Sequence, residues 1–433
     1  EEILSKYGEK LIPVVEKDRV VGVITRMDLL HAYRRHIQGL RAIEKKISRP
    51  EDIRGLLEEI GQEAKGLGYK VYLVGGVVRD LLMRKRIWDL DLVVEGDAIA
   101  LACKLGEKWQ VNCHTFQEFG TAHMKYKDYK LEFATTRRET YPHPGSYPVV
   151  EWATLKEDLL RRDFTINAMA LSLNPEDFGT LIDYFGGLRD LKDGIIRVLH
   201  PMSFVEDPVR ILRALRFAGR FGFKLSKGTE KLLKKAVSLG LLKKAPRGRI
   251  LNELRLALRE ERLLEILRLY KRYGVLEQII EGFVFKPELE SLLERLKDIV
   301  SWHKIEFPQE ALDYGWVFLL LLLKDTKGED LLKEISAPSW VRESYKLMKE
   351  SLHNLISQLQ KAQKPSEIYL TLKGKPTALL LILMLYQKEK VKLYMERLRF
   401  IKVDVENFKH LKGKELGEAI ERERLRLMDS LLL

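Results

Sequence analysis

The pattern of apolar and polar positions divides the chain into two stretches with different periodicity. Short runs in which apolar and polar residues alternate predict strands at 70–74, 89–95, about 111–116, 121–127 and 130–136. From about residue 206 onward the pattern is helical, with turns near Gly240, Pro246, Gly274, Pro287, Pro308, Pro338, Pro365 and Pro376. The sequence therefore predicts an α+β fold, in which a compact head with a sheet precedes a long helical body.

Capping residues and prolines set further boundaries. Ser48 predicts the cap of a helix that ends at Gly68. Thr154 and Glu157 have the spacing of a capping box, which begins another helix. Three prolines and a glycine within 137–150 predict a loop that is long enough to be functional.

The two strongest apolar runs are Trp316 to Leu323 and Ala378 to Tyr386. Both fall short of the roughly 18 residues that a membrane-spanning helix needs. We therefore expect two buried helices, no membrane contact and a cytoplasmic protein. The chain begins at Glu1 without the charged segment and apolar run of a signal peptide.

The first 45 residues contain a separate short pattern. Two apolar runs lie on either side of a polar turn at Lys17 and Asp18, and a helix is expected after Thr25. This order resembles the closing part of a CBS module, a unit that normally occurs in pairs and often senses adenine nucleotides. Half a module suggests that the chain is part of a longer protein, and a simple β-hairpin extension is the alternative. We assign no ligand to this segment.

Charge and cysteine content narrow the function classes. The net charge of +13 and the pI near 9.3 favour a polyanionic partner such as nucleic acid, although simple solubility is the alternative. Only Cys103 and Cys113 are present, so a disulfide framework and a four-cysteine zinc site are excluded. Nothing in the sequence indicates a stable protein partner.

The strongest chemical pattern is a glycine turn followed by a strand with two aspartates. Gly75 and Gly76 allow the backbone to approach phosphate oxygens, and Arg79 lies one helical step further. Residues two apart in a strand project on the same face, so Asp89 and Asp91 lie together. Their mutual repulsion is relieved most simply by Mg²⁺ shared with the phosphates of a nucleotide. The pattern predicts a site for nucleoside triphosphates.

A third acid could join this pair. Glu132 lies on the strand predicted at 130–136, which could pair beside the aspartate strand. A catalytic role and an ordinary solvated strand glutamate remain alternatives.

These residues and three later motifs resemble, in order, the class II tRNA CCA-adding enzymes and bacterial poly(A) polymerases. The resemblance covers residues 70 to about 225. It rests on Gly75-Gly76 with Arg79-Asp80, Asp89 with Asp91, Arg161 to Ala170, Asp183 to Leu191, and Glu206 to Arg210 extended by Arg213 and Arg216.

The last motif can be interpreted physically. Asp207 and Arg210 are three apart on an expected helix and share a face. A carboxylate accepts hydrogen bonds and a guanidinium donates them, which suits the edge of cytosine or adenine. Guanine and uracil would leave buried polar groups unpaired, at about 1–3 kcal/mol each. The pair cannot separate cytosine from adenine, and an intrahelical ion pair is the structural alternative.

The resemblance implies a polymerase-β-like mixed-sheet head and a role for each matched residue. Asp89 and Asp91 would be catalytic and would hold two Mg²⁺ ions that activate the 3′-hydroxyl of an RNA primer and steady the leaving pyrophosphate. Glu132 stays the candidate for a third catalytic acid. Asp207 and Arg210 would select the base, with Glu206 orienting Arg210. By the same resemblance, Arg162, Asp163 and Asn167 would contact the ribose and phosphates of the nucleotide, beside the matched glycine turn of Gly75, Gly76, Arg79 and Asp80. Arg213 and Arg216 lie one and two turns past Arg210 on the same expected helix face and could extend the nucleotide site toward the triphosphate, although Arg216 could instead be structural.

The expected organisation is a partial CBS-like segment (1–45), a catalytic head (46–190), a helical neck with the base-selecting helix (191–275), and a helical body and tail that grip the tRNA acceptor end (276–433).

The length of the 137–150 loop and the CBS-like start favour addition of the terminal A of CCA from ATP. Full CCA addition with CTP and ATP is the next alternative, and poly(A) synthesis follows it. A catalytically silent RNA-binding protein or an adenine-nucleotide sensor would be non-enzymatic alternatives.

Overall fold

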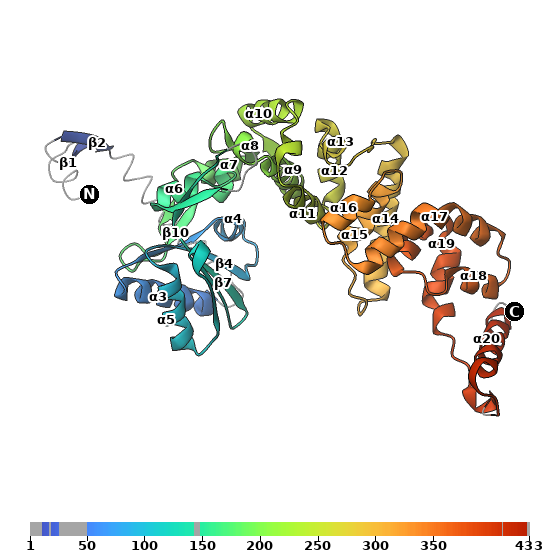
Figure 1. Ribbon diagram of the computed structural model, residues 1–433. Helices are drawn as coiled ribbons and strands as arrows, with labels where there is room; N and C mark the ends of the chain where they lie inside the picture. Colours follow the sequence, from blue (N-terminus) through green and yellow to red (C-terminus); the bar gives the residue numbers. More distant parts are fainter. Residues whose placement is uncertain (1–10, 17–18, 26–49, 143–147, 409, 431–433) are drawn as a thin grey trace. The chain divides into compact units, whose positions relative to one another are not determined.

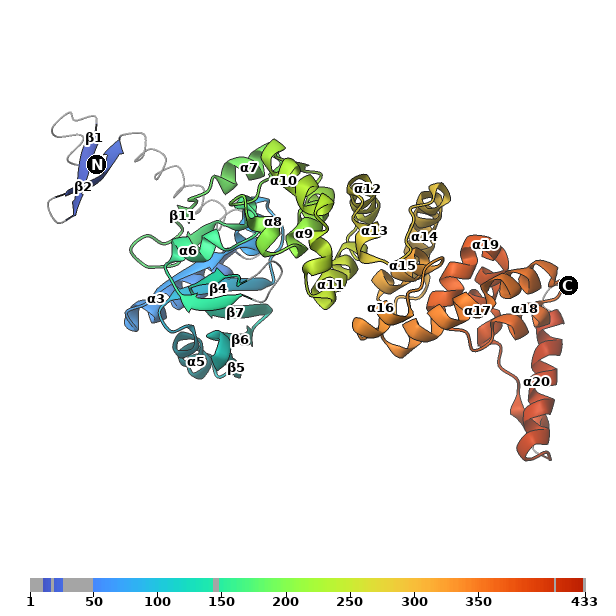
Figure 2. The ribbon, with the colours of Figure 1, turned by 45° about the horizontal axis from the view of Figure 1, so that its top comes forward.

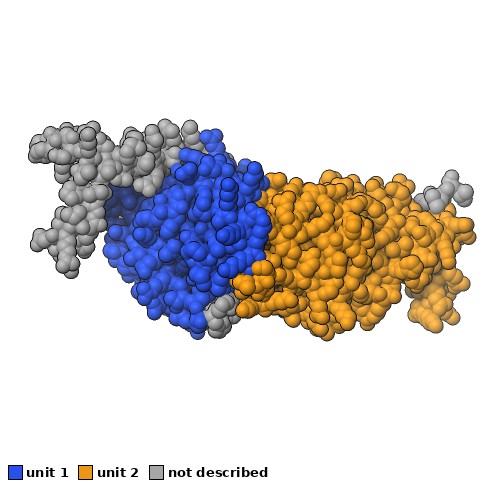
Figure 3. Space-filling view, turned by 90° about the horizontal axis from the view of Figure 1, so that it is seen from above, with its two compact units in different colours: residues 1–210, 221–235 blue, residues 211–220, 236–433 orange. Residues whose placement is uncertain are grey.

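The computed structural model describes residues 11–16, 19–25, 50–142, 148–408 and 410–430 (Figure 1). The chain separates into two compact units, residues 1–210 with 221–235 and residues 211–220 with 236–433 (Figure 3). A mixed sheet in the first unit and helices throughout the second confirm the predicted α+β class. The finer four-part division stays a prediction.

The amino-terminal segment forms the predicted pair of strands. Strands β1 (Leu11–Glu16) and β2 (Arg19–Thr25) are antiparallel. The helix expected after Thr25 and the cap at Ser48 lie outside the described residues, and the CBS-like interpretation stays a prediction.

The first unit is built around a seven-stranded sheet with the order β11-β10-β3-β4-β7-β6-β5. Strands β4 and β7 are parallel, and all other neighbours in this sheet are antiparallel. The five predicted strands are all present. The bounds are β3 Lys70–Val74, β4 Asp89–Glu95, β5 Cys113–Phe116, β6 Thr121–Tyr126, β7 Tyr129–Thr135, β10 Ala170–Ser172 and β11 Leu181–Ile182.

One face of this sheet packs on two helices. Helices α3 (Pro50–Gly66) and α5 (Ala98–Trp109) lie on the same side of the sheet (Figure 2). They cover Leu90 and Leu92 of β4 together with Leu131 and Phe133 of β7, all of which are buried. The alternation of these apolar residues with polar ones fixes which side chains point to the opposite face.

The opposite face is covered over only part of its width. Helix α6 (Leu155–Leu160) packs over β3, the inner part of β4 and β10, where Leu159 and Val93 join a second buried cluster. The predicted capping box of Thr154 and Glu157 begins this helix. Residues of β7, β6 and β5 that project on this same side are partly or fully exposed. The sheet therefore has an open face on the side of β5.

The segment 137–150 differs from the prediction of a continuous loop. Strands β8 (Arg137–Thr140) and β9 (Val149–Trp152) form an antiparallel ribbon. Arg138 and Glu151 are register partners in this ribbon and form an ion pair at 2.6 Å. Cross-strand pairs of this kind stabilise a two-stranded ribbon, which the turn-rich composition concealed. Residues 143–147 lie outside the described part.

The remaining elements of the first unit include helices α9 and α10, which it shares with the second unit. Strands β12 and β13 are parallel partners. Their bounds and those of the helices are α4 Gly76–Leu82, α7 Gly187–Asp193, β12 Ile195–Ile196, α8 Ser203–Glu206, α9 Val209–Phe221, β13 Lys224–Leu225 and α10 Lys227–Ser238.

The second unit is helical. Its bounds are α11 Arg247–Leu258, α12 Leu263–Tyr273, α13 Leu276–Ile279, α14 Pro287–Glu306, α15 Tyr314–Leu323, α16 Glu329–Glu334, α17 Ser339–Lys361, α18 Pro365–Leu372, α19 Thr377–Glu396 and α20 Gly413–Ser430. The two apolar runs are the buried helix α15 and the first half of α19, as predicted. Among the described residues, none of the helices combines the length and the apolar content that a bilayer crossing requires.

Candidate active site

Three carboxylates lie on the open face at the start of β4 and on β7. Asp91 is the register partner of Glu132, and Asp89 is the partner of Lys130. The predicted position of Glu132 beside the aspartate strand is confirmed. Burial raises the pKa of Asp91, the charges of Glu132 and Asp89 raise it further, and Arg162 opposes them. The charged form of Asp91 is therefore disfavoured by the carboxylates of Glu132 and Asp89.

The donor set fits a hard cation that brings part of its own coordination. Within the described ranges, no group of three or more His, Cys, Asp or Glu side chains is placed to hold a metal ion. Mg²⁺ usually takes only one or two protein carboxylates and fills its shell with water and substrate phosphates. Asp89 and Asp91 offer such a pair, and a cation there would relieve the repulsion that raises the pKa of Asp91.

The glycine turn brings an arginine directly over the backbone. Gly75 precedes α4 with φ 75° and ψ −133°, a conformation that glycine tolerates. A Cβ at this position would lie 2.6 Å from Nη1 of Arg162. The Nε of Arg162 is buried and has no hydrogen-bond partner among the described residues. The missing Cβ of Gly75 therefore leaves the space that the guanidinium of Arg162 occupies.

Arg79 lies in a network instead of projecting into solvent. Its side chain is buried, and its guanidinium donates to Asn167 Oδ1 and to both carboxylate oxygens of Asp80. Asn167 Nδ2 in turn donates to Asp163 Oδ1 at 2.9 Å. The guanidinium also lies 5.0 Å from the ring centroid of Phe221. The structure brings these four predicted residues together, and it shows them holding one another in place.

Arg161 and Arg162 are held by a buried carboxylate that the motifs did not single out. Asp158 on α6 is fully buried and accepts hydrogen bonds from Arg161 Nη2 at 2.8 Å, Arg162 Nη2 at 3.0 Å and the backbone N–H of Arg137 at 3.2 Å. The sequence could have predicted these contacts, because Asp158 precedes the two arginines by three and four residues, and residues at this spacing share one side of a helical turn.

The proposed base-selecting pair meets, but not on one helix. Asp207 follows α8 in an extended conformation (φ −131°, ψ 92°), and α9 begins at Val209. The expectation that both residues are helical is wrong, because Pro208 disfavours helical geometry in the residue before it. Asp207 instead accepts from the backbone N–H of Val209, and its Oδ2 lies 3.9 Å from Nε of Arg210.

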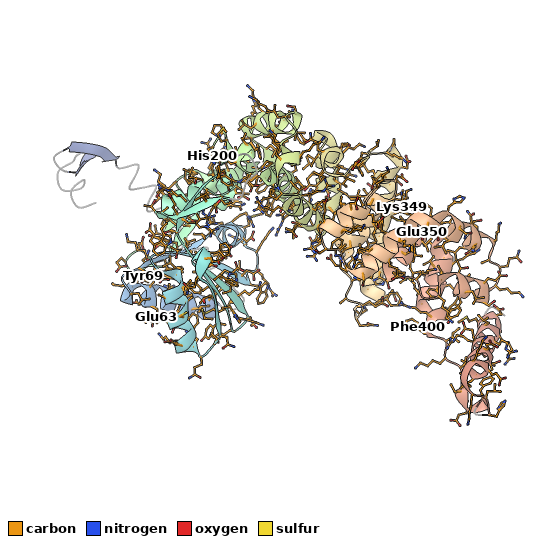
Figure 4. All side chains as sticks on the ribbon, viewed as in Figure 1. Glu63, Tyr69, His200, Lys349, Glu350 and Phe400 are labelled. Carbon is orange, nitrogen blue, oxygen red and sulfur yellow. The ribbon has the colours of Figure 1, made fainter. Side chains whose placement is uncertain are left out.

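Other residues fix the orientation of Arg210. Its Nη1 donates to Ser203 Oγ at 2.9 Å, and its Nη2 donates to the carbonyl oxygen of Arg161 at 2.7 Å. Glu206 was expected to orient Arg210, but in the described structure its carboxylate lies 3.4 Å from Nε2 of His200. Figure 4 marks the position of His200. Burial lowers the pKa of His200, the charge of Glu206 acts to raise it, and the charge of Arg210 lowers it further. The sequence motif contained Arg161 but did not indicate that its backbone would be used.

The β8–β9 ribbon reaches this pair. The hydroxyl of Tyr141 donates to Glu139 Oε2 at 3.0 Å, and Glu139 Oε1 accepts from Arg161 Nη1 at 3.0 Å. Burial raises the pKa of Tyr141, with a further contribution from Glu139, and the charges of Arg210 and Asp207 also act on this phenol. The segment between 137 and 142 therefore lies beside the residues that are expected to select the base.

Arg213 and Arg216 lie in the second unit and belong to a different cluster. The side chain of Arg216 is 8% exposed and forms ion pairs with Glu253 and Glu260. Arg213 lies 3.7 Å from Glu253 as well. These contacts fit the structural alternative that the sequence left open for Arg216, and they give no support to an extension of the nucleotide site along α9.

Comparisons with known proteins place the chain in a family. Residues 71–197 match the poly(A) polymerase head domain, and residues 222–292 match a probable RNA- and SrmB-binding site of polymerase A. The A-adding tRNA nucleotidyltransferase of Aquifex aeolicus (strain VF5) is 58% identical over 441 residues, which cover 100% of this chain and 54% of that protein. The chain spans about half the length of the curated relatives that it matches.

Solved structures agree with this placement. A tRNA-processing enzyme in an apo form is 57% identical with a TM-score of 0.79, and the match covers 89% of this chain and 100% of that one. A tRNA nucleotidyltransferase complexed with a primer tRNA and an incoming ATP analog is 60% identical with a TM-score of 0.71, and the match covers 78% of this chain and 98% of that one. The chain belongs to the class II tRNA nucleotidyltransferase and poly(A) polymerase family.

Proposed function

We propose that the chain transfers AMP from ATP to the 3′ end of tRNA that ends in CC, and so adds the terminal A of CCA. The observation that carries the proposal is the row formed by Asp91 and its register partner Glu132, with Asp89 on the same face and the Asp207–Arg210 pair in the same unit. The full-length similarity to an A-adding tRNA nucleotidyltransferase supports the choice of substrate. Because the chain covers about half the length of that relative, the activity is proposed for these 433 residues.

The reaction is an in-line displacement that needs no side-chain nucleophile. The 3′-oxygen of the primer attacks the α-phosphorus of ATP, the bond to the bridging oxygen of the β-phosphate breaks, and pyrophosphate leaves. The hydroxyl proton is released to the carboxylates or to the water beside them. Enzymes of this class typically depend on a metal ion, and Mg²⁺ on Asp89 and Asp91 would neutralise the charge that develops on the phosphates.

The remaining residues position the nucleotide. We assign the approach of the phosphates to Gly75 and Gly76, with Arg162 as the cation beside them. Arg79, Asp80, Asp163 and Asn167 bond mainly to one another. We therefore assign to them the role of stabilising the conformation of the nucleotide site beside the glycine turn.

Base selection follows from hydrogen-bond polarity. Arg210 is anchored by Ser203 and by the carbonyl of Arg161, so its remaining N–H groups have fixed directions. Together with the acceptor Asp207 it presents one donor and one acceptor, which matches adenine or cytosine and mismatches guanine or uracil. Because the charges of Arg210 and Asp207 act on the phenol of Tyr141, we assign the preference for adenine to the part of the ribbon near Tyr141. A cytoplasmic location follows from the proposed tRNA substrate.

The test uses three tRNA primers, which end before CCA, after C and after CC, each with labelled ATP or CTP. Incorporation of ATP on the CC-ended primer alone is the expected result. Incorporation of CTP on the two shorter primers would replace the proposal with full CCA addition. Continued incorporation of ATP into a long tail would indicate poly(A) synthesis, and binding of tRNA without any incorporation would leave only the RNA-binding alternative.

A further inference from the structure

The open face of the sheet continues beyond the carboxylates as an ordered surface. Residues in register across β4, β7, β6 and β5 form a row: Asp91, Glu132, His123 and His114. The row beside it consists of Asp89, Lys130 and Lys125. On its other side lies a row of mostly small side chains that ends in an aromatic one: Val93, Ala134, Thr121 and Phe116. All these side chains project away from the core that α3 and α5 cover.

An exposed aromatic pair stands at the end of these rows. The ring of Phe116 is 5.2 Å from the ring of His123 with an interplanar angle of 66°. Phe116 is 49% exposed, although burial of a phenylalanine side chain would release roughly 1.5–3 kcal/mol. Its neighbours across the sheet, Thr121 and Ala134, are too small to cover it. A flat ring that is left uncovered on a polar surface is suited to stack on another flat group.

Two lysines face each other across the same surface. Lys125 and Lys130 are register partners on β6 and β7, and both are exposed. Like charges that lie directly opposite one another destabilise a pair of strands. Among the described residues, neither lysine forms an ion pair, although Asp89 is the register partner of Lys130. An anion between the two lysines would turn their repulsion into attraction.

Aromatic rings that alternate with cations are the features that bind single-stranded nucleic acid. Stacking on an aromatic side chain contributes to the binding of any base, and lysines bind the phosphates that join the bases. The surface is continuous with the carboxylates, because His123 Nδ1 lies 3.7 Å from Glu132 Oε1. A strand that follows it would end at Asp89 and Asp91.

We propose that the surface made by Phe116, His123, Lys125 and Lys130, here named the primer face, holds the unpaired 3′ end of the RNA that receives the new nucleotide. This inference rests on the proposed nucleotidyl transfer and extends it to the acceptor strand. A base of the primer stacks on Phe116 and His123, a phosphate lies between the two lysines, and the terminal 3′-hydroxyl is thereby directed to the carboxylates.

The first test separates primer binding from ATP binding. Phe116→Ala should raise the KM for CC-ended tRNA at least about fivefold, which corresponds to the lower end of one lost base stack. The KM for ATP should stay within about twofold of the wild type, and Phe116→Trp should restore primer binding. The matched control is Tyr184→Ala, because Tyr184 is 51% exposed in the same unit and has no assigned role in binding the primer or ATP.

The second test uses salt. Each phosphate contact on a single strand contributes about 0.7 to the slope of log K against log salt concentration. Because the two lysines share one phosphate, replacing both Lys125 and Lys130 with alanine should lower the magnitude of this slope for CC-ended tRNA by about 0.7. Circular dichroism and thermal unfolding check the fold, and Phe116→Leu replaces Phe116→Ala if the alanine variant is unstable.

The outcomes distinguish this inference from the proposed function. If the wild type incorporates AMP but the variants keep the primer KM and the salt slope, the primer face is refuted and the transfer activity stands. An equal rise of both KM values would also refute it, since the residues would then act on the whole site. If the wild type incorporates no nucleotide, the proposed function itself fails, and unchanged tRNA binding by the variants would refute the primer face as well.

Discussion

Replacing Asp158 with alanine should destabilise the head and displace the arginines of its active site. This carboxylate is fully buried and bonds to the side chains of Arg161 and Arg162 and to the backbone of Arg137. Removing it leaves two guanidinium groups without their shared acceptor in a poorly solvated place. The cost should exceed that of any exposed ion pair, which contributes up to about 1 kcal/mol.

The magnitude follows from the burial of the three groups. Removal of one partner from a buried ion pair costs about 3–5 kcal/mol. The arginine side chains are 17% and 18% exposed, so some water reaches them and the lower end, about 3 kcal/mol, is expected. At about 2–4 °C per kcal/mol for a unit of this size, the Tm should fall by about 6–12 °C.

Thermal unfolding followed by circular dichroism measures this loss, and steady-state kinetics measure the effect on ATP. The control is Asp128→Ala, because Asp128 is an exposed aspartate of the same unit and its loss should change the stability by less than about 0.5 kcal/mol. A Tm within about 2 °C of the wild type for Asp158→Ala would refute the reasoning, since the buried carboxylate would then contribute no more than an exposed one.

The same carboxylate gives a pH dependence. Burial raises the pKa of Asp158, but the charges of Arg162 and Arg161 outweigh burial and hold the pKa below its ordinary value of 3.8. A depressed folded-state pKa adds stability above the unfolded pKa, and this stability is lost as the pH falls through the folded pKa. The difference in stability between the wild type and Asp158→Asn should therefore be constant near neutral pH and should shrink below about pH 4.

Three further substitutions test the site. Asp89→Ala should abolish AMP incorporation while tRNA binding stays nearly intact, and residual turnover near that of the wild type would contradict the metal assignment. Gly75→Ala should raise the KM for ATP about tenfold or more, because the Cβ would displace Arg162 and the strained backbone costs about 1–3 kcal/mol. Gly68→Ala is the control, because Gly68 has a similar φ but open space around the added Cβ. Equal effects of the two substitutions would exclude the Arg162 contact as the cause. Asp207→Asn should reduce discrimination between ATP and GTP at least about fivefold in kcat/KM, since an amide can also donate to a carbonyl; unchanged discrimination would remove Asp207 from base selection.

Local chemistry explains which parts of the fold the sequence could predict. The strands at 70–74 and 89–95 and the capping box at Thr154 depend on neighbouring residues alone, and they are present. The position of Glu132 beside Asp91 could be predicted once both segments were recognised as strands. Each strand alternates apolar and polar residues, so the polar residues of the two strands can share the solvent-facing side of one sheet.

The parts that could not be predicted depend on distant partners or on competing local rules. Arg216 and Glu253 are 37 residues apart in sequence, so only the folded chain shows that the arginine is engaged. Spacing suggested one helix for Asp207 and Arg210, but the conformational effect of Pro208 prevailed. The ribbon at 137–152 was concealed because prolines and glycine between its strands dominate the composition of that stretch.

The pairing of β4 with β7 ties chemistry to correct folding. Side chains alternate between two faces, so a shift of either strand by one residue would exchange its carboxylates for leucine or phenylalanine. Such a mispaired chain would carry charged groups into the core and apolar groups into water, and it would fail to fold stably before it could fail as a catalyst. The sheet thereby excludes partly active, mispaired forms from the folded population, and a preparation that passes a stability test should contain the carboxylate row in a single arrangement.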